Sequence, residues 1–155
     1  MISLLQSSYK VIMDKLYIVY WTSSGNTEEM ASHIADGVRE AGKEPEIVQV
    51  SKIDPDTLKD QSAFALGCSA MGAEELDEDE MEPFVESVEK FSAGKTIGLF
   101  GSYGWGDGEW MRTWVKRMQD AGAVIPDGRG VIAQESPDKE AVDECEALGK
   151  ALAAV

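Results

Sequence analysis

The chain has 155 residues, 43% of them hydrophobic, and its 29 acidic and 14 basic residues give a net charge of −15. This length fits one domain with a substantial core, and no apolar run approaches the length of a membrane span. The strong negative charge argues against nucleic acid or an anionic membrane as a partner and favours partner proteins with basic patches.

Residues 1–12 stand apart from the pattern that follows them. They lack a sustained apolar core and a small-residue cleavage site, so they make a poor signal peptide. We expect them to be a dispensable extension or a start-site artefact, ahead of a single domain at residues 13–155. Cys68 and Cys145 have no metal-binding spacing and lie in apolar segments, which predicts reduced thiols in a cytoplasmic protein.

The first clear element is an apolar and aromatic run at residues 16–20, typical of a strand buried on both faces. A loop of small and polar residues follows, and then an amphipathic helix predicted at residues 26–41 and ended by Gly42. A hydroxyl-rich loop at a helix N-terminus favours a phosphate, because backbone N–H groups and the helix dipole attract the anion. The loop residues are Thr22, Ser23, Ser24, Gly25, Asn26 and Thr27.

This loop contains no Lys or Arg and does not match the glycine-rich loops of nucleoside triphosphate or dinucleotide sites. It therefore predicts a site for one terminal phosphate held by hydrogen bonds. The alternative is an ordinary strand-to-helix turn in which a hydroxyl caps the helix, but one cap needs only one such residue.

Strands are also predicted at residues 46–50, 63–67 and 96–100, with a fifth divided between 124–125 and 131–133. Further helices are predicted at 82–91 and 109–121, and a last one begins at a cap formed by Ser136 and Pro137. This alternation predicts an α/β fold with a doubly wound, five-stranded parallel sheet of order 2-1-3-4-5. By analogy, a ligand should bind at the carboxyl ends of the strands, near the first and third.

The loops expected there after the third and fourth strands, residues 67–74 and 101–108, are built alike. Each consists mainly of small residues and carries one large side chain, Met71 or Trp105. Two such polarizable groups facing each other could hold a planar heterocycle between them. The alternatives are that Met71 fills a gap in the core and that Trp105 packs on its own helix.

The sequence resembles the flavodoxin family, whose members carry electrons on flavin mononucleotide (FMN). Thr22, Ser24, Gly25 and Thr27 match that family's phosphate loop, Thr/Ser-x-Ser/Thr-Gly-x-Thr. Residues 69–72 and 100–108 are similar to the flavin loops of the short-chain flavodoxins in which Met and Trp flank the ring. The resemblance covers nearly all of residues 16–155 and implies a flavodoxin-like fold; Ala73 departs from it, since Asp is more usual there.

The resemblance implies roles for individual residues. Met71 and Trp105 would contact the isoalloxazine ring, the Gly72 carbonyl would lie near N5, and Glu74 would accept the N3–H. Thr22, Ser24 and Thr27 would donate to the phosphate, assisted by Ser69. The remaining predicted FMN-binding residues are Ser23, Gly25, Asn26, Ala70, Ala73, Ser102, Tyr103, Gly104, Gly106, Asp107 and Gln134.

The function predicted is that of a low-potential one-electron carrier, an electron-transfer protein rather than an enzyme, without a metal site. The acidic residues at 74–82 should make the second reduction step strongly reducing and provide a docking surface for basic redox partners. We expect a monomer and give His33 no role. The alternatives are an FMN-dependent quinone or nitro reductase on the same fold and a phospho-acceptor receiver domain, which would need acidic residues after the first strand.

Overall fold

The computed structural model describes residues 15–155, so the extension expected at residues 1–12 lies outside the described part. Five parallel strands form one sheet in the order β2-β1-β3-β4-β5. This confirms the predicted fold class and strand order. The strands are β1 (Lys15–Trp21), β2 (Glu44–Gln49), β3 (Ala63–Cys68), β4 (Thr96–Tyr103) and β5 (Val131–Gln134).

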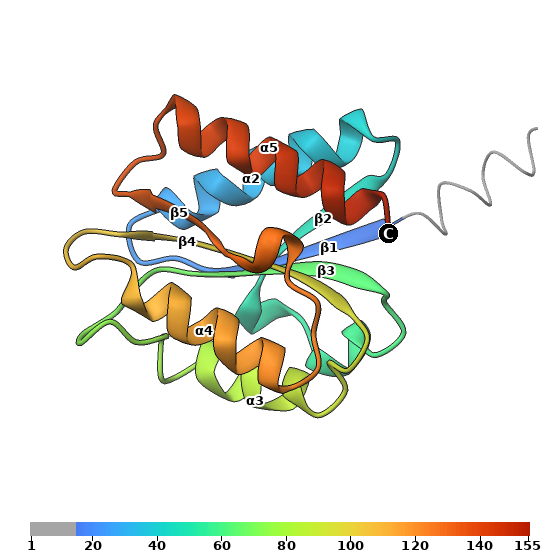
Figure 1. Ribbon diagram of the computed structural model, residues 1–155, viewed down its shortest axis with the longest axis horizontal. Coiled ribbons are helices and arrows are strands. Elements are labelled where there is room, and N and C mark those ends of the chain that lie inside the picture. The colour runs from blue at the N-terminus through green and yellow to red at the C-terminus, as the bar shows by residue number, and fades with distance from the viewer. Residues whose placement is uncertain (1–14) are drawn as a thin grey trace, which may run out of the picture.

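Helices cover both faces of the sheet, with α2 and α5 on one side and α3 and α4 on the other (Figure 1). Short 3₁₀ turns η1, η2 and η3 lie in the connections. No helix within residues 15–155 combines the length and apolar character needed to cross a membrane. The helices are α2 (Asn26–Glu40), α3 (Met81–Glu89), α4 (Glu109–Asp120) and α5 (Lys139–Ala153), and the 3₁₀ turns are η1 (Val50–Lys52), η2 (Pro55–Leu58) and η3 (Pro126–Gly128).

The hydrophobic core is divided by the sheet into two halves. Ile18 faces the α2 and α5 side, where it packs with Met30 and Ile34. Its neighbour Val19 faces the other half of the core, with Trp114 of α4. Successive side chains of a strand point to opposite faces, so a strand covered on both sides must be apolar throughout. This is why β1 is a continuous apolar run.

The structure corrects three details of the predicted elements. β4 continues to Tyr103, beyond residue 100, because residues 100–103 pair with β5. β5 is a single strand, and Val124 forms only an isolated bridge to Thr96. The last helix is capped by Asp138, whose carboxylate accepts from the Ala141 N–H at 2.9 Å, rather than by Ser136 and Pro137.

Candidate functional site

A hollow of about 480 Å³ opens among the loops at the carboxyl ends of the strands. These loops lie on the left in Figure 1, where the chain leaves β1 for α2 and β4 for α4. None of the lining residues is a Lys or Arg. They are Ser23, Ser24, Asn26, Ser69, Ala70, Ser102, Tyr103, Gly104, Glu135 and Ser136.

The N-terminus of α2 provides free donors at this hollow. Gly25 precedes the helix with a left-handed φ of 96°, and no side chain caps the first turn. The backbone N–H groups of Asn26 and Thr27 have no acceptor within residues 15–155. Thr22 Oγ1 accepts from the Gly25 N–H at 3.0 Å, which leaves the Thr22 hydroxyl proton free to donate. Such a set of unpaired N–H groups fits a phosphate.

Three buried polar groups connect the loops beneath the hollow. Thr27, fully buried, accepts from the Ser102 N–H at 3.1 Å, and its hydroxyl lies 2.7 Å from that of Ser69. A buried hydroxyl proton needs an acceptor, which makes Ser69 Oγ the acceptor and leaves the Ser69 proton to donate into the hollow. Thr27, expected as a phosphate donor, has its hydroxyl bonded within the protein and joins three strand ends.

The other side of the site carries the two large side chains that the sequence singled out. Trp105 is 68% exposed and Met71 is 37% exposed. Exposed apolar side chains of this size contribute little to folding and are typical of ligand or partner contacts. A Cβ added to Gly72 or Gly104 would meet no atom within 4 Å, so there is open space beside both loops. The residues present therefore fit a flat ring between the loops after β3 and β4.

Glu74 joins these two loops. Its Oε1 accepts from the Glu109 N–H at 3.2 Å, at the start of α4, where Gly108 offers no side-chain cap. Glu74 also has a left-handed φ of 56°, which is uncommon for a residue with a side chain. The backbones of Met71 and Glu75 pair in both directions at 2.8 Å and close the loop that contains Glu74.

Trp110 of α4 contacts the last residues of β3 and β4. Its indole N–H donates to the Cys68 carbonyl at 3.1 Å, and its ring lies 5.4 Å from that of Tyr103, centroid to centroid. Burial raises the pKa of the Cys68 thiol to about 12. Because the thiolate is the reactive form, Cys68 is a packing residue at this site and not a redox group.

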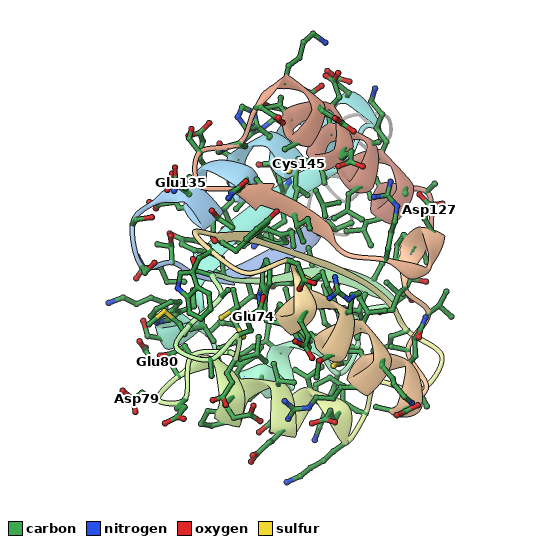
Figure 2. All side chains as sticks on the ribbon, turned by 60° about the vertical axis from the view of Figure 1, so that its left-hand side comes forward. Glu74, Asp79, Glu80, Asp127, Glu135 and Cys145 are labelled. Carbon is green, nitrogen blue, oxygen red and sulfur yellow. The ribbon has the colours of Figure 1, made fainter. Side chains whose placement is uncertain are left out.

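The acidic residues after β3 have different roles. Asp77 is buried and its carboxylate accepts from the N–H groups of Glu80 and Met81 at 2.7 and 3.1 Å, which caps α3. Hydrogen bonds from Arg117 lower the pKa of Glu82. The acids left exposed are Glu75, Glu78, Asp79 and Glu80. Figure 2 shows Asp79 and Glu80 extending outward, below Glu74.

Most of the predicted site residues meet at this edge of the sheet. Gln134, the last residue of β5, donates to the carbonyl of Gly104, which lines the hollow, at 3.4 Å. Sequence reasoning missed Glu135 and Ser136, which also line the hollow. Glu135 has a left-handed φ of 57°, and its carbonyl accepts from the Ser102 hydroxyl at 2.6 Å. No sequence pattern predicts a left-handed backbone at a Glu residue.

Comparisons with known proteins agree with this geometry. A family model described as "Flavodoxin" matches residues 18–149. The chain is 47% identical over 136 residues to a flavodoxin of Clostridium beijerinckii, covering 88% of this chain and 97% of that protein. It is 43% identical over 136 residues to a flavodoxin of Megasphaera elsdenii, covering 88% and 96%.

The fold agrees as closely. The solution structure of the two-electron reduced Megasphaera elsdenii flavodoxin superposes with a TM-score of 0.83 at 42% identity, over 90% of this chain and 99% of that one. The hollow at the start of α2 and the exposed side chains of Met71 and Trp105 thus lie on a flavodoxin-like fold, as the sequence predicted. The chain belongs to the flavodoxin family and, like its members, is an electron-transfer protein that binds FMN.

Proposed function

We propose that this protein is a low-potential one-electron carrier whose FMN is bound with its phosphate at the start of α2 and its ring between Met71 and Trp105. The observation that carries the proposal is the convergence of uncapped α2 N–H groups and two exposed, polarizable side chains on one edge of the sheet. FMN, when bound, supplies the chemistry by accepting and passing on electrons one at a time.

The phosphate end holds its ligand without a cation. The hollow offers the hydroxyls of Ser23, Ser24 and Ser69, and the free N–H groups of Asn26 and Thr27. Each hydrogen bond to a charged group contributes roughly 1.5–3 kcal/mol, so several of them are enough for tight binding. Among residues 15–155 the structure offers a second phosphate no equivalent group of donors beside the hollow, which supports FMN over FAD.

The ring end controls how easily electrons are accepted. Glu74 is half-buried and Glu75 is exposed, and no Lys or Arg belongs to the loops at 69–80 and 101–108. Asp107 contributes less, because Arg112 lies 3.0 Å from its carboxylate. Negative charge close to a partly desolvated site disfavours adding further negative charge. These carboxylates therefore lower the potential of the second reduction step.

Flavodoxins transfer electrons to redox partner proteins. We infer that partners dock through basic patches on the exposed acids Glu75, Glu78, Asp79 and Glu80, in the connection after β3, and that association weakens as salt screens these charges. We also infer a monomer, which sedimentation velocity tests. A cytoplasmic location, supported by the two free cysteines, is tested by cell fractionation.

The test of the function is a reductive titration of the purified protein. We expect about one FMN per chain on chromatography of the released cofactor, two separate one-electron steps, and negligible turnover with NAD(P)H and a quinone. FAD as the main cofactor would contradict the single phosphate site. Steady NAD(P)H-driven turnover would instead show a reductase.

A further inference from the structure

His33, the one histidine of the chain, lies outside the FMN site, on α2. Its side chain is 25% exposed and lies between two carboxylates of the same helix. Nε2 is 3.4 Å from Glu29 Oε2, and Nδ1 is 3.9 Å from Asp36 Oδ2. Neither contact is a short, well-formed hydrogen bond, so the imidazole is surrounded by acceptors without being firmly bound to one.

A third carboxylate comes from α5. One donor atom each of His33, Asp36 and Glu146 lies within 4.8 Å of the other two. A tetrahedral zinc ion with bonds of about 2.0–2.2 Å holds its ligands roughly 3.4 Å apart. The three side chains are half-buried or exposed, so small rotations close the difference without moving the backbone.

The backbone that holds these groups is firmly packed. α2 and α5 cross with direct backbone contact, because a Cβ at Gly37 would overlap the Glu146 carbonyl and a Cβ at Gly149 would overlap the Ile34 carbonyl. Gly37 directly follows Asp36, and Gly149 lies one helical turn beyond Glu146. The close crossing therefore fixes the positions from which the three side chains extend.

Arg39 is the one cation that forms an ion pair with a member of this group within residues 15–155, and it offsets only one of the three negative charges. Asp36 lies 3.3 Å from Arg39, but Lys150 pairs with Glu40 and Lys139 pairs with Asp143. Within residues 15–155, Glu146 takes part in no ion pair. Three carboxylates around one imidazole leave an excess of negative charge, which a divalent cation would offset.

We propose that His33, Asp36 and Glu146 form a binding site for a divalent first-row transition metal such as Zn²⁺, with water completing the coordination and Glu29 beside it. An imidazole with two carboxylates suits Zn²⁺, Co²⁺, Ni²⁺ or Mn²⁺, whereas Mg²⁺ and Ca²⁺ prefer all-oxygen sites. The ion joins α2 to α5 and stabilises the folded protein.

The test uses the FMN-loaded protein and Zn²⁺ itself. We expect calorimetry to give one Zn²⁺ per chain, and a metal concentration of a hundred times Kd to raise Tm by about 5–10 °C. His33→Asn and Glu146→Gln should each weaken binding at least tenfold. Glu40→Gln is the matched control, because it removes one carboxylate from the same helix pair outside the site.

The single histidine also gives a direct signal, since Zn²⁺ should shift the imidazole resonances of the wild-type protein at one equivalent. Ca²⁺ should leave them unchanged, and the visible flavin spectrum should be the same with and without Zn²⁺. Equal Zn²⁺ affinity in all four proteins would overturn the proposal. Imidazole resonances that do not shift with Zn²⁺ would also overturn it. Ca²⁺ binding as tightly as Zn²⁺ would overturn it too, because it would show only diffuse attraction of cations to an acidic surface.

Discussion

Beneath the start of α2, three polar residues are buried and hydrogen-bonded to one another, whereas the loops after β3 and β4 leave Met71 and Trp105 in solvent. Thr27, Ser69 and Ser102 are each at most 5% exposed, compared with 68% for Trp105. The phosphate end is thus organised before any ligand arrives. The ring end, formed by the loops after β3 and β4, is open and acidic. One of the contacts that hold it is the hydrogen bond from the Glu109 N–H of α4 to Glu74.

Because of this difference, we expect the two regions to determine different properties of the electron carrier, namely its affinity for FMN and its redox potentials. Donors fixed in advance lose little entropy on binding, so we expect the phosphate end to provide most of the affinity. The ring end has to meet partner proteins and set the potentials, which needs exposure and charge. Substitutions at the two ends should therefore change different measurements.

The largest effect is expected from Thr27→Val, which deletes the hydroxyl that connects three loops. The Ser102 N–H loses its acceptor, so the free energy of unfolding should fall by about 2 kcal/mol, as measured by urea denaturation. FMN and riboflavin affinities should both fall about ten- to a hundredfold, because both ends of the site depend on this connection. Thr27→Ser should restore most of both. A loss for FMN alone would make Thr27 a phosphate donor instead.

Ser24→Ala should separate the two ends more cleanly. Ser24 is exposed and lines the hollow, so we expect its hydroxyl to contribute to ligand binding and not to the stability of the fold. Loss of one hydrogen bond to a charged group should weaken FMN binding about tenfold. Riboflavin affinity and Tm should be unchanged when measured by fluorescence quenching and thermal melting; an equal loss for riboflavin would place the phosphate elsewhere.

Glu74→Gln should change the ring end alone. The amide oxygen still accepts from the Glu109 N–H, but one negative charge is lost beside the ring. We expect the potential of the second reduction step to rise by about 40 mV, the equivalent of ~1 kcal/mol for one electron, with FMN affinity of the oxidised protein nearly unchanged. Glu40→Gln, at the far end of α2, is the control, and an equal rise there would point to net charge alone.

The smallest effect is expected from Glu135→Asn. Asn tolerates a left-handed backbone better than Glu, so stability should increase by about 0.5 kcal/mol. Removing a carboxylate from the rim of an anion site should also tighten FMN binding about two- to threefold. Weaker FMN binding in a titration at low salt would show that Glu135 has a positive role at the phosphate.

The fold could be predicted because its signals are local. Apolar runs mark the strands, and Gly42 and Gly122 follow α2 and α4 with positive φ. Gly94, expected to end the third helix, lies five residues beyond Glu89, the last residue of α3. The end of β4 was missed because Ser102 and Tyr103 have the composition of a loop, and they are a strand only because β5 pairs with them. The cap of the last helix was predicted wrongly because both Ser136 and Asp138 are residue types that cap helices. The structure shows that Asp138 is the cap.

The site residues could be predicted as a group, but their interactions could not. Thr27 meets Ser69 and Ser102, which are 42 and 75 residues away along the chain. No local pattern carries such a contact. Glu74 was predicted from family resemblance as a ring contact, and its cap on α4 depends on how two loops meet in space.

The central claim is that fixed donors at the start of α2 bind the phosphate of FMN and provide most of the affinity. Calorimetric titration of the flavin-free protein with FMN and with riboflavin tests this directly. We expect one FMN per chain and binding at least a hundredfold tighter than that of riboflavin, since two or more hydrogen bonds to the phosphate are lost without it. Equal affinity for the two flavins would contradict the account.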